Sequence, residues 1–558
     1  MKKILFILFL ANINTFSQSK LSEVEKFKQT GLIWGLLKYH HPKISYGLYD
    51  WNLEFIKLTE EIKGDISQTT LNDKLLKFII KFNSGADFKT KKINIDFDKV
   101  FKKNINYSWI KDSLFGVELT YELNKIKENG NLGDYYASLD KSKMMDFSNE
   151  KGMPDFNSSL QNYRLLEFYS FWNIIQYWNV NKYLTDKEWL EVLEELTEEF
   201  INATTTYNYE IAKLKMFAKL NDSHSYKISD FFKSTLFNKH PVFSGEILND
   251  TVIVTKIYNK KLAQNDSIAL KDIIVGIEGL SIKNYIDKTF DPIISSSNRT
   301  YLNGRLENSY LFSSNKNSLE IEVINKFGKI ETKSIKLYEK YTSDNFETLY
   351  NNKKDHWKKI KPTITYINLD NITSKELSIA FTKAHNDKGI ILDLRNYPKN
   401  ITNSDLAKYL YPERKLFVDV LFPVKNNPSL GELNGNTPLK IILDPFKAGS
   451  KNSNYYKGKV LLLVNSKTGS KAEYLGMLIQ QSPNCITIGE QTAGAVMNIS
   501  SSILPDNQQF YFTGLGAFYP NGTGLQRQGL KIDYEIKGSV SNFDTELYIN
   551  EAVKIIEN

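Results

Sequence analysis

The segment Lys457 to Glu490 constrains the fold of this chain more than any other stretch. Its apolar run from Val460 to Val464 is continuous. Because a strand with this pattern is apolar on both faces, the run predicts a strand that is buried on both sides. A short polar connection follows, and the apolar residues after Ser470 recur at helical spacing. A buried strand that leads through a tight turn into a helix is typical of an α/β domain.

Ser470 is the residue of this segment that can carry chemistry. It lies at the first turn of the predicted helix, where backbone N–H groups lack intrahelical partners. The serine can cap those donors, with Glu473 completing a capping box three residues later. Alternatively, the donors can hold a developing oxyanion. The local pattern alone favours the cap, so the choice between the two depends on the rest of the chain.

Length and composition indicate a multidomain globular protein. With 558 residues the chain exceeds one ordinary hydrophobic core, and we expect two to four domains. The net charge of +8 is a mild bias over this length. Neither a long basic run nor a repeated basic-aromatic motif is present, so nucleic-acid binding is not expected. The sequence does not determine the oligomeric state.

The first residues predict an export signal over 1–17. Lys2 and Lys3 precede the apolar stretch from Ile4 to Ala11, and a cleavage point follows at Ser17. The apolar stretch is too short to span a bilayer, and no later segment approaches that length. We therefore expect a protein in the periplasm, outside the cell or associated with the outer membrane, without an integral membrane segment after signal removal.

The chain contains one cysteine, Cys485, so it forms no intramolecular disulfide. The residues around Cys485 are apolar, which favours a packed core thiol over a nucleophile. Stability must therefore come from the size of the core.

A helical domain is predicted over 18–235, and it contains a weak internal repeat. Trp34, Tyr39 and Trp51 recur as a second set with the same spacings, formed by Trp172, Tyr177 and Trp189. We interpret the repeat as two helical hairpins that bury tryptophans at the same depth. Short alternating runs then predict a small β-rich module over 240–345. Strands alternating with helices predict an α/β domain over 350–558.

Four segments, in this order along the chain, resemble the tail-specific (C-terminal processing) serine protease family, on its tricorn-core-like branch. They are residues 220–225 (LNDSHS), 272–279 (DIIVGIEG), 391–396 (ILDLRN), and 468–473 (TGSKAE) with 489–494 (GEQTAG). The resemblance implies a multidomain α+β fold. Its parts would be a helical N-terminal domain, a PDZ-like domain over 240–345 and a catalytic α/β domain of the ClpP/crotonase type over 350–558.

The resemblance also implies a role for individual residues. Ser470 matches the family nucleophile. One branch of the family uses a lysine base, but Ala495 stands at that place and no lysine occurs between Lys471 and Lys531. The other branch uses a histidine preceded by a serine. His224 and Ser223 match this pair, with His224 as general base and Ser223 orienting it.

Two departures from the family pattern concern the catalytic machinery. Gln526 stands where the branch usually has a glutamate, and an amide supplies no charge to stabilise an imidazolium. Residues 396–400 (NYPKN) stand where the family usually has a Gly-Gly oxyanion turn. By resemblance, the oxyanion donors would be the backbone N–H groups of Lys471 and Lys399, since Pro398 has none.

Other chemical signals in the sequence are weak. His40 and His41 are adjacent, and no carboxylate at helical spacing completes a metal site. No glycine-rich phosphate loop is present. We therefore expect neither a metal nor another cofactor.

The sequence thus predicts an exported serine-type endopeptidase that acts on peptides or unfolded proteins. The alternative is a catalytically impaired peptide-binding protein with the same fold, and Gln526 together with residues 396–400 motivates it. A polysaccharide-active protein is less favoured, because paired carboxylates are not visible in the sequence.

Overall fold

A computed structural model describes residues 20–88, 100–129, 133–225, 229–307, 309–339, 356–434, 444–536, 538 and 546–558. The predicted export signal lies outside these residues. The chain divides into two compact units, one of residues 1–91 and 107–133 and the other of residues 92–106 and 134–558. In the described part of the chain, no helix is both long and apolar enough to cross a membrane.

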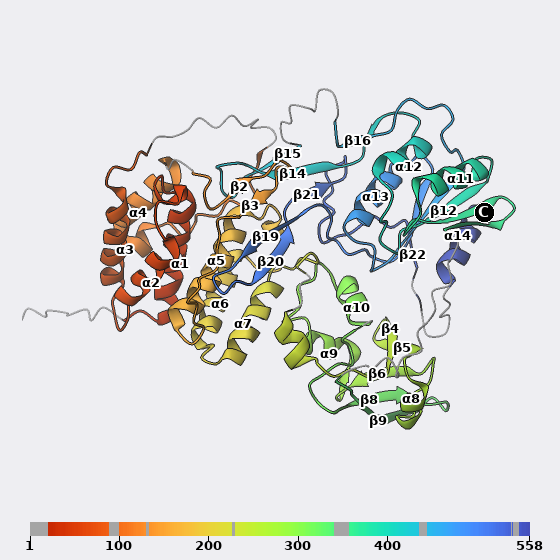
Figure 1. Cartoon of the computed structure of the whole chain (residues 1–558), viewed down its shortest axis with the longest axis horizontal. Coiled ribbons are helices and arrows are strands. Elements are labelled where there is room, and N and C mark those ends of the chain that lie inside the picture. The colour runs from red at the N-terminus through yellow and green to blue at the C-terminus, as the bar shows by residue number, and fades with distance from the viewer. Residues whose placement is uncertain are drawn as a thin grey trace, which may run out of the picture. The chain divides into compact units, whose positions relative to one another are not determined.

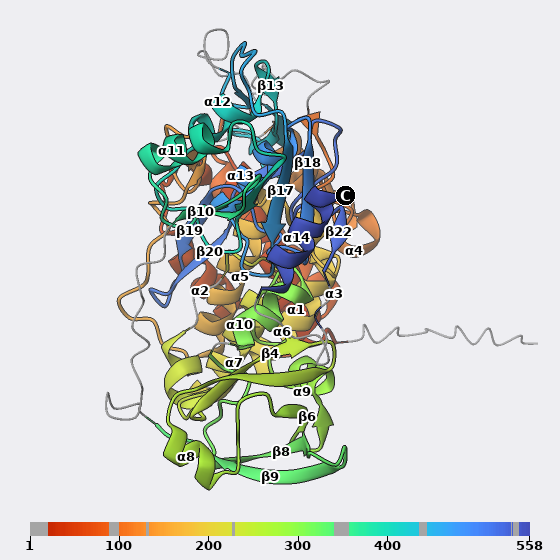
Figure 2. The same ribbon diagram turned by 90° about the vertical axis from the view of Figure 1, so that its right-hand side faces the viewer.

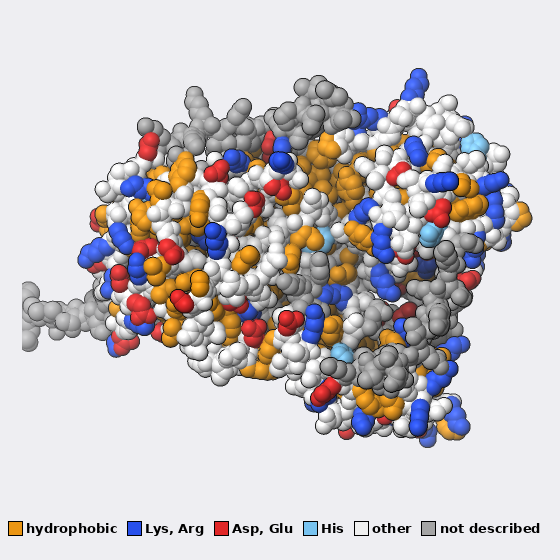
Figure 3. Space-filling view, in the orientation of Figure 1, with side chains coloured by type: hydrophobic (Ala, Val, Ile, Leu, Met, Phe, Trp, Pro, Cys, Tyr) orange, Lys and Arg blue, Asp and Glu red, His pale blue; other side chains and the backbone are white. Residues whose placement is uncertain are grey.

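The first unit is helical. Its elements are α1 (Glu23–His40), η1 (Ile44–Tyr46), α2 (Trp51–Glu61), α3 (Gln68–Asn83) and α4 (Asp112–Asn129). Ser22 and Glu25 form a capping box that fixes the start of α1. Gly116, with φ of 71°, interrupts α4 with a kink. Acidic and basic side chains are interspersed over the left-hand part of the face drawn in Figure 3.

The second unit begins with a copy of the same helical arrangement. Its elements are α5 (Gln161–Trp178), η3 (Lys182–Leu184), α6 (Trp189–Asn202) and α7 (Thr206–Ala218). Each begins 138 residues after its counterpart in the first unit, as the starts of α1 at 23 and α5 at 161 illustrate. The helical region that we expected as one domain over 18–235 is therefore a pair of copies that belong to different compact units.

A reciprocal tryptophan pair explains the repeated spacing. The Trp34 indole donates to the Trp51 carbonyl at 2.9 Å, and the Trp51 indole donates back to the Trp34 carbonyl at 3.0 Å. Trp172 and Trp189 make the same two bonds at 2.9 and 3.1 Å. Both ring pairs are stacked, with centroids 6.4 and 6.3 Å apart. Each pair satisfies its own buried polar groups, so each copy fixes its helix hairpin independently.

A five-stranded antiparallel path, order β4-β5-β6-β8-β9, forms the next part of the second unit. Its elements are β4 (Phe243–Leu248), β5 (Thr251–Ile257), α8 (Lys260–Asn265), β6 (Ile273–Ile277), β7 (Leu280–Ser281), α9 (Ile282–Thr289), α10 (Arg299–Glu307), β8 (Ser318–Ile324) and β9 (Ile330–Lys336). A π-helical turn, η4 (Phe232–Leu236), precedes it. Glu278 and Gly279 form the turn after β6, and both have positive φ.

The predicted α/β part is also confirmed. It is a six-stranded sheet of order β10-β11-β12-β17-β18-β22 that is parallel except for β10. The strands are β10 (Trp357–Lys361), β11 (Ile364–Asn368), β12 (Gly389–Asp393), β17 (Lys459–Val464), β18 (Cys485–Gly489) and β22 (Tyr534–Glu535). The helices are α11 (Ser374–Ala384), α12 (Asn403–Leu410), α13 (Lys471–Gln480) and α14 (Leu547–Glu557). Helices α11 to α13 share a core with one face of the sheet, and α14 packs on the other (Figure 2).

Smaller strands connect this sheet to the helices of the second unit. They are β1 (Val100–Phe101), β2 (Ser138–Leu139), β3 (Met145–Asp146), β13 (Lys415–Leu416), β14 (Asp419–Pro423), β15 (Gly431–Leu433), β16 (Lys447–Ala448), β19 (Ile499–Ile503), β20 (Gln509–Thr513) and β21 (Gly516–Phe518). The β19–β20 hairpin lies against α5 and α7 (Figure 1), where Phe171 contacts Phe510 and Lys213 pairs with Asp506. This hairpin ends at Thr513, beside the site described below.

The paired tryptophans give a test of the repeat. We expect Trp34→Phe to speed amide exchange in α1 to α3 and Trp172→Phe to do so in α5 to α7, because each variant leaves a buried carbonyl without its donor. Each change should cost about 1–3 kcal/mol of local stability. Hydrogen exchange followed by mass spectrometry would measure this, with Trp357→Phe in β10 as a control. Equal acceleration in both copies by either variant would contradict independent packing.

Candidate active site

A strained turn places Ser470 between β17 and α13. Ser470 has φ of 55° and ψ of −119°, a conformation that non-glycine residues rarely adopt. Thr468 anchors the turn, because its hydroxyl donates to the Leu394 carbonyl at 2.8 Å and accepts from the Asn465 N–H at 3.1 Å. Such strain costs on the order of 1–3 kcal/mol and is typical of functional sites.

Ser470 does not cap its helix through the side chain, so the capping box expected from local sequence is wrong. Glu473 is fully buried and turns instead to the loop that follows β18. Its carboxylate accepts from the Thr492 hydroxyl at 2.5 Å, the Gly494 N–H at 2.8 Å and the Ala495 N–H at 3.0 Å. Burial raises the pKa of Glu473 to about 7, although these donors favour the charged form.

The loop held by Glu473, residues 492–495, contacts both halves of the predicted catalytic pair. The Ser470 N–H donates to the Ala495 carbonyl at 2.9 Å. On the other side, the Ser223 hydroxyl donates to the Ala493 carbonyl at 3.0 Å across 270 positions of sequence. The Ser470 turn and the His224 segment therefore bind the same short loop.

His224 is buried, with 5% of its surface exposed. Its Nδ1 lies 2.8 Å from the Thr513 hydroxyl, and its Nε2 is buried without a hydrogen-bond partner among the described residues. Burial lowers the pKa of His224 below its ordinary value, and the charge of Asp222 opposes this shift. The imidazole is therefore neutral at pH 7 and has one nitrogen available.

The environment of His224 differs in two respects from the sequence-based expectation. The Ser223 hydroxyl, expected to orient the imidazole, accepts from the Ser297 N–H at 3.0 Å and donates to Ala493, so Thr513 holds the ring instead. Gln526 does reach this cluster. Its amide lies 3.3 Å from both the Asp222 carboxylate and the Thr513 hydroxyl.

The two predicted oxyanion donors lie near each other but are not equivalent. The Lys471 side chain donates to the Lys399 carbonyl at 3.0 Å, which joins α13 to the loop over 396–400. In the described part of the chain, the Lys471 N–H has no hydrogen-bond partner. The Lys399 N–H already donates to the Asp370 carbonyl at 2.9 Å. Of these two N–H groups, only that of Lys471 is without a partner among the described residues and available as a donor.

Two residues of the cluster, Asp222 and Thr513, were not predicted from the sequence. Asp222 directly precedes the Ser223-His224 pair, so its position was a usable signal. Thr513 had none, because it ends β20, 289 positions from His224. Within the described residues, no group of three or more histidine, cysteine or acidic side chains could hold a metal ion.

Comparisons with known proteins agree with this architecture. Residues 363–536 match peptidase family S41. Probable CtpA-like serine proteases of Staphylococcus aureus strains N315 and Mu50 are each 24% identical over 296 residues, which is 52% of this chain and 50% of the relative. The chain thus spans about half the length of the curated relatives it matches.

A solved structure shows the same fold. Mature CPAF complexed with lactacystin superposes with a TM-score of 0.53 at 10% identity, covering 71% of this chain and 98% of CPAF. A crystal structure of mature CPAF gives the same TM-score, with 97% of its chain covered. Over residues 363–536, this chain is therefore similar to peptidase family S41, and its curated relatives are probable CtpA-like serine proteases.

Proposed function

We propose that this protein is an exported serine endopeptidase, with Ser470 as nucleophile and His224 as general base. The observation that carries the proposal is the strained turn at Ser470. The loop over 492–495 that accepts the Ser470 N–H also accepts a hydrogen bond from Ser223, next to His224. The match of residues 363–536 to peptidase family S41 and the CtpA-like relatives support the same class of reaction. Peptides or unfolded proteins would be the substrates.

The reaction would follow the usual course of acyl transfer. The Ser470 Oγ attacks the peptide carbonyl carbon while His224 Nε2 accepts the hydroxyl proton. His224 then gives this proton to the leaving amine, and an acyl-enzyme remains on Ser470. A water molecule, deprotonated by the same nitrogen, hydrolyses the ester and restores the serine.

The oxyanion of the tetrahedral intermediate needs donors at the start of α13. The free Lys471 N–H meets this need. The Lys399 N–H can be the second donor only if it leaves the Asp370 carbonyl, since one N–H rarely serves both acceptors well. If Lys399 is that donor, substrate binding at this loop would have to release its N–H.

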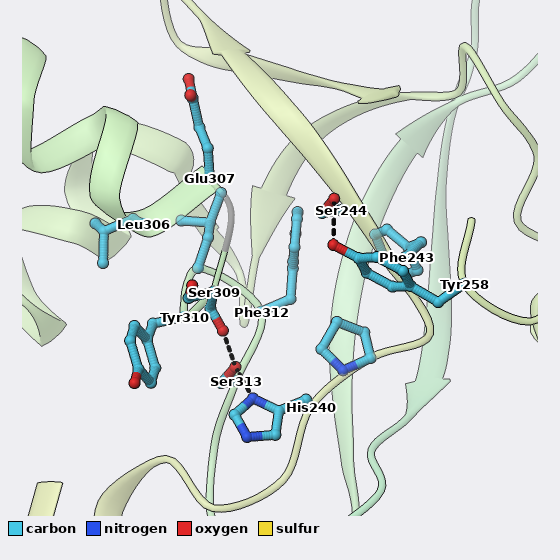
Figure 4. A pocket seen from close by; sticks show the side chains of 12 residues that line it. His240, Phe243, Ser244, Tyr258, Leu306, Glu307, Ser309, Tyr310, Phe312 and Ser313 are labelled. Atoms are coloured by element: carbon cyan, nitrogen blue, oxygen red, sulfur yellow. Dashed lines mark hydrogen bonds between the residues drawn. The ribbon is translucent and has the colours of Figure 1, made fainter. Parts of the chain in front are cut away.

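The module over 240–345 would hold the substrate as a PDZ-like domain, and the α/β part over 350–558 would be the crotonase-like catalytic domain. Strand β4 lies at the edge of its sheet, so an extended peptide could add to it. A cavity of about 360 Å³ adjoins the start of β4. Figure 4 shows its aromatic walls, Phe243, Tyr310 and Phe312, together with the hydrogen bonds between His240 and Ser313 and between Tyr258 and Ser244.

The alternative function, an impaired peptide-binding protein, has specific support. Gln526 supplies no charge, and the Lys399 N–H is occupied. A fluorophosphonate probe distinguishes the two functions, because it labels only an activated serine. The endopeptidase requires labelling at Ser470, whereas an unlabelled, folded protein that still binds peptides would be the binder.

Ser470→Ala should lower hydrolysis of a denatured protein substrate by about 10³-fold or more, because no other group can form the acyl-enzyme. Release of fluorescent fragments by the purified protein would measure the rate. Ser466→Ala, in the same turn, is the matched control and should retain activity. Unchanged hydrolysis by Ser470→Ala would exclude the proposed nucleophile.

The buried position of His224 predicts the pH dependence of the reaction. Because burial lowers the pKa of this imidazole below 6.5, a lower pH is needed to protonate half of the base than for an exposed histidine. We expect the acidic limb of the kcat/KM profile to have its midpoint below pH 6.5. A profile that declines with its midpoint above pH 6.5 would contradict His224 as the base.

A bulky side chain in the cavity beside β4 should hinder peptide docking. Ser309 lines this cavity and is exposed, so Ser309→Trp should raise KM roughly tenfold with little change in kcat, as expected for lost ground-state binding. Asn315→Trp, exposed outside the cavity lining, is the control. Equal KM values for both variants would show that substrates do not use this cavity.

A further inference from the structure

The cluster around His224 contains one carboxylate that no sequence motif assigned to catalysis. A general base that becomes an imidazolium gains from a nearby negative charge. Gln526 is neutral, so it cannot supply that charge. In the described part of the chain, Asp222 is the one carboxylate bonded to the groups that hold His224.

Asp222 is almost fully buried, with 4% of its surface exposed. Its two oxygens accept four hydrogen bonds. The donors are the His224 N–H at 3.0 Å, the Thr513 N–H at 2.5 Å, the Thr513 hydroxyl at 2.8 Å and the Gln526 amide at 3.3 Å. The four donors leave both oxygens of this carboxylate hydrogen-bonded. Among the described residues, hydrogen bonds rather than an ion pair therefore surround the buried carboxylate.

The position of the protons follows from this arrangement. A hydroxyl has one proton to donate, and Thr513 gives its proton to Asp222. At the 2.8 Å contact with His224, the Thr513 oxygen must then accept, so Nδ1 carries the hydrogen. The remaining nitrogen, Nε2, is left with its lone pair. This is the tautomer that a general base requires.

Gln526 is consistent with the same assignment. Its Nε2 donates both to Asp222 and to the Thr513 oxygen, at 3.3 Å each, while its Oε1 is buried without a partner among the described residues. An amide in this orientation reinforces Asp222 and leaves the Thr513 oxygen an acceptor. A glutamate at this place would put a second negative charge beside the first.

We propose that Asp222 is a positioning residue that acts through the Thr513 hydroxyl: it fixes the His224 tautomer and supplies the negative charge that Gln526 lacks. This inference rests on the proposed function for its kinetic consequence, but not for its structural one. The relay consists of Asp222, Thr513 and His224, with Gln526 as a supporting donor. The positioning carboxylate would thus stand two residues before the histidine in the sequence.

The tautomer can be measured without any hydrolysis. In Ser470→Ala protein labelled with ¹⁵N-histidine, the His224 signals are assigned by their loss in an added His224→Gln change. We expect the pattern of a neutral ring protonated at Nδ1. Thr513→Val should lose this preference and Thr513→Ser should restore it. A ring protonated at Nε2 in the unmodified cluster would overturn the relay.

The charge assignment has a kinetic test in a double-mutant cycle. Asp222→Asn should lower kcat/KM on the order of 10²–10³-fold, somewhat less than loss of a carboxylate bonded directly to the base. Gln526→Glu alone should give no gain, because two carboxylates would then compete. In the Asp222→Asn background, the same change should recover at least tenfold. Equal effects of Gln526→Glu in both backgrounds would overturn the assignment.

Controls separate misfolding and failure of the proposed function from failure of this inference. Asp291→Asn, on the surface, should match the unmodified protein in activity and melting temperature. Each cluster variant should retain the near-ultraviolet circular dichroism of the folded protein. If the unmodified protein neither hydrolyses peptides nor binds a fluorophosphonate, the proposed function fails. The ¹⁵N measurement then still decides whether Asp222 and Thr513 set the tautomer.

Discussion

The site depends on the hydrogen bonds that the buried Glu473 carboxylate accepts from the loop over 492–495. Glu473 lies on the first turn of α13, and its carboxylate accepts from the N–H groups of Gly494 and Ala495. The Ala495 carbonyl in turn accepts from the Ser470 N–H. Turn, helix and loop are thus closed into one hydrogen-bonded ring. Gly469 permits this approach, because a Cβ there would lie 2.9 Å from the Ala493 methyl. The strain at Ser470 persists because this ring holds it.

The two helical copies share one arrangement, but only the second leads into the segment that contains His224. Each keeps a reciprocal tryptophan pair and the same order of helices. At the offset of 138 residues, Asn83-Ser84-Gly85-Ala86 in the first copy corresponds to Asn221-Asp222-Ser223-His224 in the second. The difference lies in the loop, where side chains can change without disturbing the packed helices.

Much of the fold could be predicted from the sequence because its signals are local. The apolar run of β17, the turn after β6 and the tryptophan spacings each report the environment of their own segment. The local pattern gave a wrong prediction at Ser470, where a helix cap and a strained turn were both compatible with the sequence. The Ser470 and Glu473 spacing matches a capping box, but Glu473 gains more from three donors on a loop that passes nearby only in the folded chain.

By itself, the sequence determined the order of helical, β-rich and α/β parts, the S41-like motifs and the candidate pair of Ser470 and His224. Tertiary structure alone decided what surrounds that pair. Thr513 reaches His224 across 289 positions, and Asp222 gains its four donors from three separate segments. Hydrogen bonds act over about 3 Å, whereas sequence patterns record only neighbours along the chain. The partners of a buried charge are therefore fixed only when the chain folds.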